Sequence, residues 1–264
     1  MTCVLITNDD GIDAEGLRWL ARAALDLGLK VMVAAPAVES SGSSAAIIAA
    51  ERGGRIPVDD RDLAGLDGVP AYAVAAPPAL ITLIATRGAF GDKPDIVLSG
   101  INRGANTGRA VLHSGTVGAA LTGAANGRSS MAVSIDVGLS PKGKPHWQTA
   151  ARFAADVLPA LLEAAPPVVF NLNVPDAALD EVRGLRRGTL ASFGAVQTNV
   201  EIGEGFVRMA LADLESKLEP GTDAALLAAG YASITALSPI CEATQVHLPD
   251  EAELPLDREG LRVL

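Results

Sequence analysis

The first 36 residues alternate in a pattern that few folds accommodate. Residues 2–7 form a short apolar run rich in β-branched side chains, which predicts a strand. Apolar side chains then recur at helical spacing over residues 14–27 and stop before Gly28, and residues 30–35 predict a second strand that ends at Pro36. A strand, a helix and a strand in this order predict a parallel sheet with a right-handed crossover.

The same alternation continues to residue 175. Further strands are predicted over residues 95–98, 130–136 and 168–174, and helices over residues 78–90, 116–126 and 146–164. Residues 42–76 predict irregular structure with short strands near Ile47 and Tyr72, and residues 101–114 predict a loop. We therefore expect an α/β fold, with a Rossmann-like, doubly wound and mostly parallel sheet in residues 1–175.

The pattern changes from about residue 176. Strands and turns are predicted over residues 184–211, a short helix over 222–229 and a last strand over 231–237. We expect residues 176–264 to form a β-rich extension with a C-terminal arm, whose last strand rejoins another part of the molecule.

Charge and composition exclude several classes of partner. The chain has 264 residues and a formal net charge of −10, and its densest basic group is only Arg183, Arg186 and Arg187. A protein that binds nucleic-acid duplexes would carry a basic stripe, so we expect none as a partner. Aromatic residues make up 3% of the chain, and Tyr72, Phe90 and Phe193 are the candidates for stacking on a base.

The sequence also predicts a compartment. It contains neither a signal-peptide pattern nor an apolar run long enough to span a membrane, so we expect a cytoplasmic protein without a membrane partner. Cys3 and Cys241 lack the spacing of metal ligands, and we expect both to be buried, reduced thiols.

Polar side chains follow three of the predicted strands. Asp9 and Asp10 follow the first strand, a serine-rich stretch that includes Ser41 follows the second, and Asn102 follows strand 95–98. Ligands bind at the carboxyl ends of parallel strands, and carboxylate, amide and hydroxyl oxygens suit a hard divalent cation. Such a cation would offset the repulsion between Asp9 and Asp10. The alternative is an Asp-Gly turn in which Asp13 caps the first helix.

The stretch "HSGTV" predicts the start of a helix. Ser114, Gly115 and Thr116 would place backbone amides and two hydroxyls in its first turn, where a phosphate can bind. The alternative is an ordinary N-cap with close helix packing. The chain lacks the glycine-rich dinucleotide motif, the P-loop and the nucleophile elbow, which argues against those three classes of enzyme.

Taken together, the motifs resemble the SurE survival-protein nucleotidases. The stretches "TNDDGI", "AAPAVESSGSS", "DIVLSGINRGANTG", "HSGTV", "FNLNVP" and "GTDAALLAAGYASITAL" occur in that family's order and spacing, from residue 3 to about 240. The resemblance implies a phosphomonoesterase that depends on one divalent metal ion, Mg²⁺ or Mn²⁺, or Ca²⁺ in a crystal. It also implies nucleoside 5′- and 3′-monophosphates as substrates, and a homodimer or homotetramer joined through the C-terminal arm.

The resemblance also assigns residues. It implies Asp9, Asp10, Ser41 and Asn102 as metal ligands, with Ser40 as the alternative to Ser41. Asp9, Asp10 and Asn102 would be the catalytic residues. The phosphate would bind Asn106, Ser114, Gly115 and Thr116. Either aspartate could also act as general base or nucleophile, and His113 is a candidate acid for the leaving group.

One stretch departs from the family. Residues 76–81 read Ala-Pro-Pro-Ala-Leu-Ile, where the family usually shows a glycine and an aspartate beside the site. Two alternatives therefore stay open. The chain could be a phosphatase for a phosphomonoester that is not a nucleotide, or a protein that binds a nucleotide or phosphate without catalysis.

Overall fold

Alternate residues of the first strand face two different hydrophobic cores. In β1 (Cys3–Thr7), Val4 and Ile6 pack with helices α1 (Glu15–Asp26) and α4 (Trp147–Glu163), whereas Cys3 and Leu5 pack with α2 (Pro78–Thr86). Side chains of a strand point alternately to its two sides, so a strand that is apolar throughout is buried on both. The expected doubly wound arrangement follows from this burial.

The computed structural model describes residues 1–48, 53–138, 143–165, 167–192, 197–203, 205–212 and 218–246. Its main sheet has nine strands in the order β3-β4-β2-β1-β5-β6-β7-β11-β8. Neighbouring strands are parallel except for the pairs β3–β4 and β7–β11. After β1, these strands are β2 (Lys30–Pro36), β3 (Val58–Asp60), β4 (Ala71–Val74), β5 (Ile96–Arg103), β6 (Ser130–Asp136), β7 (Val169–Pro175), β8 (Leu185–Arg187) and β11 (Ala232–Leu237).

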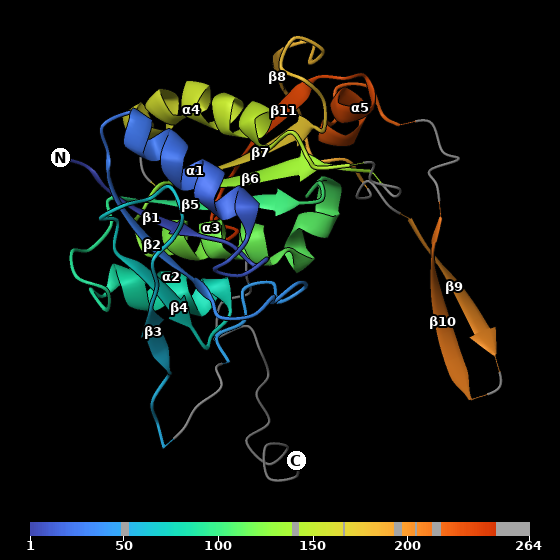
Figure 1. Ribbon diagram of the computed structural model, residues 1–264. Helices are drawn as coiled ribbons and strands as arrows, with labels where there is room; N and C mark the ends of the chain where they lie inside the picture. Colours follow the sequence, from blue (N-terminus) through green and yellow to red (C-terminus); the bar gives the residue numbers. More distant parts are fainter. Residues whose placement is uncertain are drawn as a thin grey trace.

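Helices cover both faces of this sheet. Helices α1 and α4 lie on one face, and α2 and α3 (Gly115–Ala125) lie on the other (Figure 1). The short helix α5 (Asp223–Ala228) packs beside β11. Strands β9 (Gln197–Gly203) and β10 (Phe206–Ala212) form a separate antiparallel hairpin that extends away from the main sheet (Figure 1).

The structure confirms the α/β fold and the mostly parallel sheet. The predicted last strand rejoins the main sheet as β11, between β7 and β8. Strands from residues 1–175 and from residues 176–264 share one sheet. The division into these two parts stays a prediction. The expected arm beyond residue 246 lies outside the described residues.

Three local predictions and one alternative are wrong. Residues 101–103 are not a loop: β5 continues past an irregularity, because Ile101 is fully buried and Asn102 and Arg103 pair with β6. Ile47 is exposed and belongs to no strand in the described part of this stretch, which ends at residue 48. Asp13 does not cap α1, whose N-cap is Ala14 without a side-chain bond. Cys3 is buried as expected, but Cys241 is exposed, since it follows the last strand on the surface.

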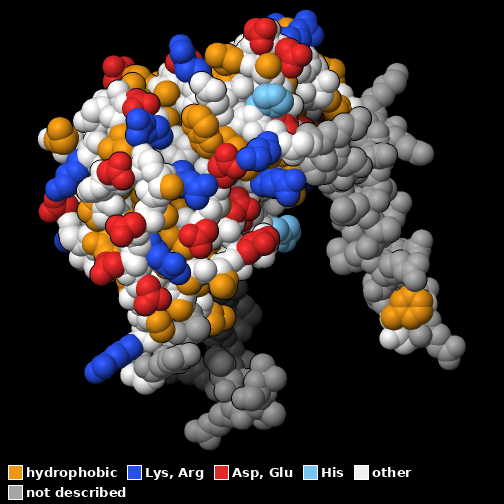
Figure 2. Space-filling view, in the orientation of Figure 1, with side chains coloured by type: hydrophobic (Ala, Val, Ile, Leu, Met, Phe, Trp, Pro, Cys, Tyr) orange, Lys and Arg blue, Asp and Glu red, His pale blue; other side chains and the backbone are white. Residues whose placement is uncertain are grey.

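Acidic and basic side chains are interspersed over the face seen in Figure 2. Within the described ranges, no helix has the length and apolar character needed to cross a membrane.

Gly16 sets how closely α1 approaches the sheet. A Cβ at this position would lie 2.1 Å from the backbone oxygen of Ile101 and 2.9 Å from Cζ3 of Trp147. In an open helix, Gly→Ala stabilises by about 1 kcal/mol. We expect Gly16→Ala to destabilise instead, by about 1–3 kcal/mol, because the backbone of β5 cannot move aside.

Urea denaturation would measure this change. Asp26→Ala is the control, because Asp26 is exposed on the same helix and its surface ion pair with Arg22 is worth less than about 1 kcal/mol. A Gly16→Ala variant as stable as the wild type would contradict the close packing of α1 on β5.

Candidate functional site

The polar residues that follow neighbouring strands meet in one pocket. It has a volume of about 480 Å³ and lies where β1, β2 and β5 end. Its lining includes all four predicted metal ligands and two of the four predicted phosphate residues. The lining residues are Asp9, Asp10, Glu39, Ser41, Gly42, Asn102, Arg103, Asn106, Ala110, His113 and Ser114.

Asp9 is buried against the first turn of α3. The hydroxyl of Thr116 donates to its carboxylate, and the backbone N–H of Thr116 binds it as well. A Cβ on Gly115 would lie 2.8 Å from Oδ2 of Asp9, so only glycine allows this approach. The positive end of the helix dipole therefore faces a carboxylate of the protein itself.

The two aspartates are electrostatically unfavourable in this position. Burial raises the pKa of Asp9, although the hydrogen bonds from Thr116 oppose the rise. Burial, together with the nearby charge of Asp9, raises the pKa of Asp10 to about 6. The backbone N–H of Arg103 donates to Asp10 at 3.3 Å and offsets only part of this cost. A bound cation would lower both pKa values.

Ser41 and Asn102 supply neutral oxygens to the same pocket. Ser41 is exposed and its hydroxyl donates to the carboxylate of Glu39 at 2.6 Å. The side-chain nitrogen of Asn102 donates to the carbonyl of Gly104 at 2.7 Å, which leaves its side-chain oxygen as the atom for a metal. Ser40 uses its backbone N–H to bind the carbonyl of Asp9 and is not among the lining residues.

The donor set fits a hard divalent cation. Carboxylate, amide and hydroxyl oxygens are ligands of Mg²⁺, Mn²⁺ or Ca²⁺, and a bound cation would oppose the rise that burial causes in the pKa values of Asp9 and Asp10. Among the described residues, no three His, Cys, Asp or Glu side chains form a metal-binding group. A metal here would therefore also need Ser41 and Asn102.

The predicted phosphate residues divide into two groups. Asn106 and Ser114 line the pocket, and Ser114 also caps α3 by accepting the backbone N–H of Val117 at 3.1 Å. Gly115 and Thr116 do not line it, since both pack against Asp9. The helix predicted from "HSGTV" is confirmed as α3, but its first turn is occupied in large part by Asp9.

Sequence reasoning left Glu39 and Arg103 out of the site. Glu39 adds a third carboxylate to the lining, and Arg103 is the only Lys or Arg among the lining residues. Both follow predicted strands, so their positions alone could have identified them. His113 lines the pocket as well, which keeps it a candidate acid.

The candidates for stacking on a base lie elsewhere. Tyr72 stacks on Phe90, with ring centroids 5.1 Å apart, and Phe90 is buried in the core below α2. Phe193 lies outside the described residues. Residues 76–81 run into the start of α2, which begins at Pro78, and none of them lines the pocket, so the departure from the family pattern lies outside its lining.

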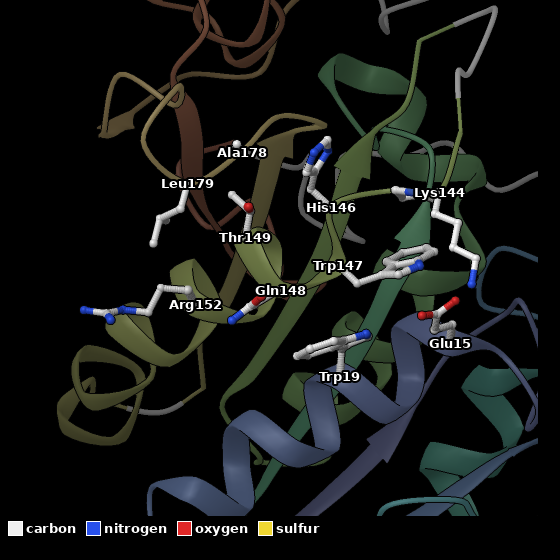
Figure 3. Close-up of a pocket in the computed structure, with 11 residues that line it drawn as sticks. Glu15, Trp19, Lys144, His146, Trp147, Gln148, Thr149, Arg152, Ala178 and Leu179 are labelled. Carbon is white, nitrogen blue, oxygen red and sulfur yellow. The ribbon is translucent and has the colours of Figure 1, made fainter.

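A second pocket of about 490 Å³ lies between α1 and α4. Trp19 from α1 and Trp147 from the start of α4 line it, together with Glu15 and Lys144 (Figure 3). It contains none of the predicted site residues.

Comparisons with known proteins agree with this geometry. The family model described as Survival protein SurE matches residues 4–196. The chain is 34% identical over 248 residues to a protein of Bradyrhizobium sp. (strain ORS 278) named 5'-nucleotidase SurE, covering 89% of this chain and 92% of that protein. A protein of the same name from Aeromonas hydrophila is 33% identical over 243 residues, with 89% and 91% covered.

The fold is also that of a solved relative. The crystal structure of the SurE protein from Aquifex aeolicus matches with a TM-score of 0.75 and 27% identity, covering 92% of this chain and 96% of that one. The chain therefore belongs to the SurE family, whose relatives compared above are named 5'-nucleotidases.

Proposed function

We propose that this protein hydrolyses nucleoside 5′-monophosphates, and also 3′-monophosphates, to a nucleoside and phosphate with the help of one divalent metal ion. The observation that carries the proposal is the pocket in which Asp9 and Asp10 lie beside Ser41, Asn102, Asn106 and Ser114. The two carboxylates alone would repel an anionic substrate, so a cation is needed to hold the substrate beside them.

The residues of the pocket would have different roles in binding the metal and the phosphate. Asp9, Asp10, Ser41 and Asn102 would hold Mg²⁺ or Mn²⁺. When bound, the metal would neutralise developing charge on the phosphoryl group and lower the pKa of a bound water. Thr116 keeps the Asp9 carboxylate in place through its hydroxyl and backbone N–H.

The phosphate would lie on the other side of the pocket. Asn106 and Ser114 would orient it with amide and hydroxyl donors, and Arg103, which also lines the pocket, would add positive charge. His113 would protonate the leaving oxygen, and Asp9 or Asp10 would act as the base. We also expect a homodimer or homotetramer joined through residues 176–264, and a cytoplasmic location.

One observation favours a second substrate class. The described residues that line the pocket include no Phe, Tyr or Trp, so none of them offers a large aromatic face for a base to stack on. A phosphatase for small phosphomonoesters that are not nucleotides fits such a lining as well. If the protein binds phosphate in this pocket but hydrolyses no phosphomonoester, it is a phosphate-binding protein.

A substrate panel would separate these functions. We expect release of phosphate from nucleoside 5′-monophosphates with Mg²⁺ or Mn²⁺, and none in EDTA. We expect Asp9→Asn to lower kcat by at least roughly 100-fold, because it weakens the metal site. Asp13→Asn, in the exposed loop after the site, is the matched control and should behave as the wild type.

Three outcomes of the panel would count against the proposal. Equal activity in EDTA would contradict the metal dependence. Preference for simple phosphomonoesters over nucleotides would favour the second substrate class. No release with any metal, in a folded protein that binds phosphate, would favour the binding protein.

The raised pKa of Asp10 predicts a pH-dependent stability of the metal-free protein. A carboxyl group with a pKa of about 6 when folded, against an ordinary value of 3.8, destabilises the fold wherever it must ionise. This rise corresponds to about 3 kcal/mol at most. In EDTA, Asp10→Asn should therefore stabilise the protein at pH 8, and the gain should disappear as the pH falls from about 6 to below about 4.

Urea denaturation across this pH range would measure the gain. Saturating Mg²⁺ should reverse it, because only the wild type keeps the full set of ligands. A variant that is less stable than the wild type in EDTA at pH 8 would show that Asp10 is not an uncompensated charge.

A further inference from the structure

Two asparagines of β7 lie fully buried in the middle of the sheet, where an unbonded polar group is costly. Asn171 and Asn173 are two residues apart, so their side chains lie on the same side of the strand. Both side-chain nitrogens donate to the backbone carbonyl of Asn106, each at 2.9 Å. The side-chain oxygen of Asn173 accepts the backbone N–H of Asn106 at 2.7 Å. We call these three hydrogen bonds the amide clasp.

The side chain of Asn106 is held as well. Its side-chain nitrogen donates to the hydroxyl of Ser134 at 2.8 Å, and Ser134 is paired in register with Asn173. The NH₂ group of an asparagine carries two donors, and this bond uses one of them. The second N–H of Asn106 therefore stays available to a phosphate oxygen in the pocket that the residue lines.

The same segment is bound at a second point by the C-terminal part of the chain. The carboxylate of Asp223, fully buried at the start of α5, accepts the backbone N–H of Gly108 at 2.8 Å. Residues 106–108 are thus bonded to residues that lie 65 or more positions away in sequence. Asp9 depends on different contacts, with α3. Asn106 is therefore held by contacts other than those that hold Asp9.

We propose that Asn173, assisted by Asn171, is a positioning residue that holds Asn106 in place for the substrate phosphate. Asn173 does not line the pocket, so it acts through Asn106. This inference rests on the proposed function, in which Asn106 binds the phosphate. It predicts that loss of the clasp weakens phosphate binding and leaves the metal site intact.

Asn173→Ala and Ser233→Ala form the matched pair for the test. Ser233 is paired in register with Asn173 on β11, is equally buried, and its hydroxyl has no hydrogen-bond partner in the described part of the chain. We expect Asn173→Ala to lower kcat/KM by roughly 10- to 100-fold, mainly through KM, and to raise the inhibition constant of inorganic phosphate in parallel. The affinity for Mn²⁺ alone, followed by calorimetry, should not change.

Asn171→Ala and Ser233→Ala complete the kinetic comparison. Asn171→Ala should have an intermediate effect, since it removes only one of the two donors to the carbonyl of Asn106. Ser233→Ala should match the wild type. If Asn173→Ala keeps the KM of the wild type, or loses Mn²⁺ affinity and phosphate affinity together, the positioning role is wrong. Should Asn173→Ala fail to fold, Asn173→Asp keeps the side-chain size and the acceptor and replaces the donor.

Hydrogen exchange tests the clasp without any substrate. Backbone amides of residues 104–114 should exchange faster in Asn173→Ala than in Ser233→Ala, while those of α3 should not differ. Equal exchange of residues 104–114 in the two variants would overturn the clasp. A wild type that hydrolyses no phosphomonoester would overturn the proposed function instead, and exchange would still decide whether Asn173 holds the segment.

Discussion

The contact between Asp9 and the first turn of α3 is the interaction on which the rest of the site depends. A buried carboxylate is expensive, and this one sits beside a second carboxylate. Thr116 offsets part of the cost with two hydrogen bonds, and Gly115 offers the space for the approach. Because α3 packs on the sheet, its contact with Asp9 sets the direction of that side chain. The other pocket residues lie around it.

The sheet brings these donors together from distant parts of the chain. The lining residues come from the ends of β1 and β5, the segment after β2, and the segment that leads into α3. Parallel strands end at one edge, so short polar stretches separated by dozens of residues become neighbours. The C-terminal part of the chain contributes differently: β7 and α5 bind residues 106 and 108 from behind the pocket wall.

The local pattern predicted much of this arrangement. The aspartate pair, Ser41 and Asn102 follow apolar runs, so their meeting at one edge could be inferred before any coordinates. Thr116 shows the limit of that reasoning. Its place in a helix start suggested a phosphate contact, but it binds Asp9, because a carboxylate of the protein reaches the same amides. Residue type alone predicts a buried Cys241, but residue type does not reveal exposure.

The sequence by itself determined the class of fold, the order of its elements and the types of polar side chain that line the pocket. Apolar periodicity and the residue types after each strand are local properties, and they carry that information along the chain. Only the tertiary structure decided that Asn171, Asn173 and Asp223 hold the segment around Asn106. Those bonds join residues 65 or more positions apart. A local sequence pattern does not show whether a polar side chain is buried and bonded to a distant backbone group or exposed to water.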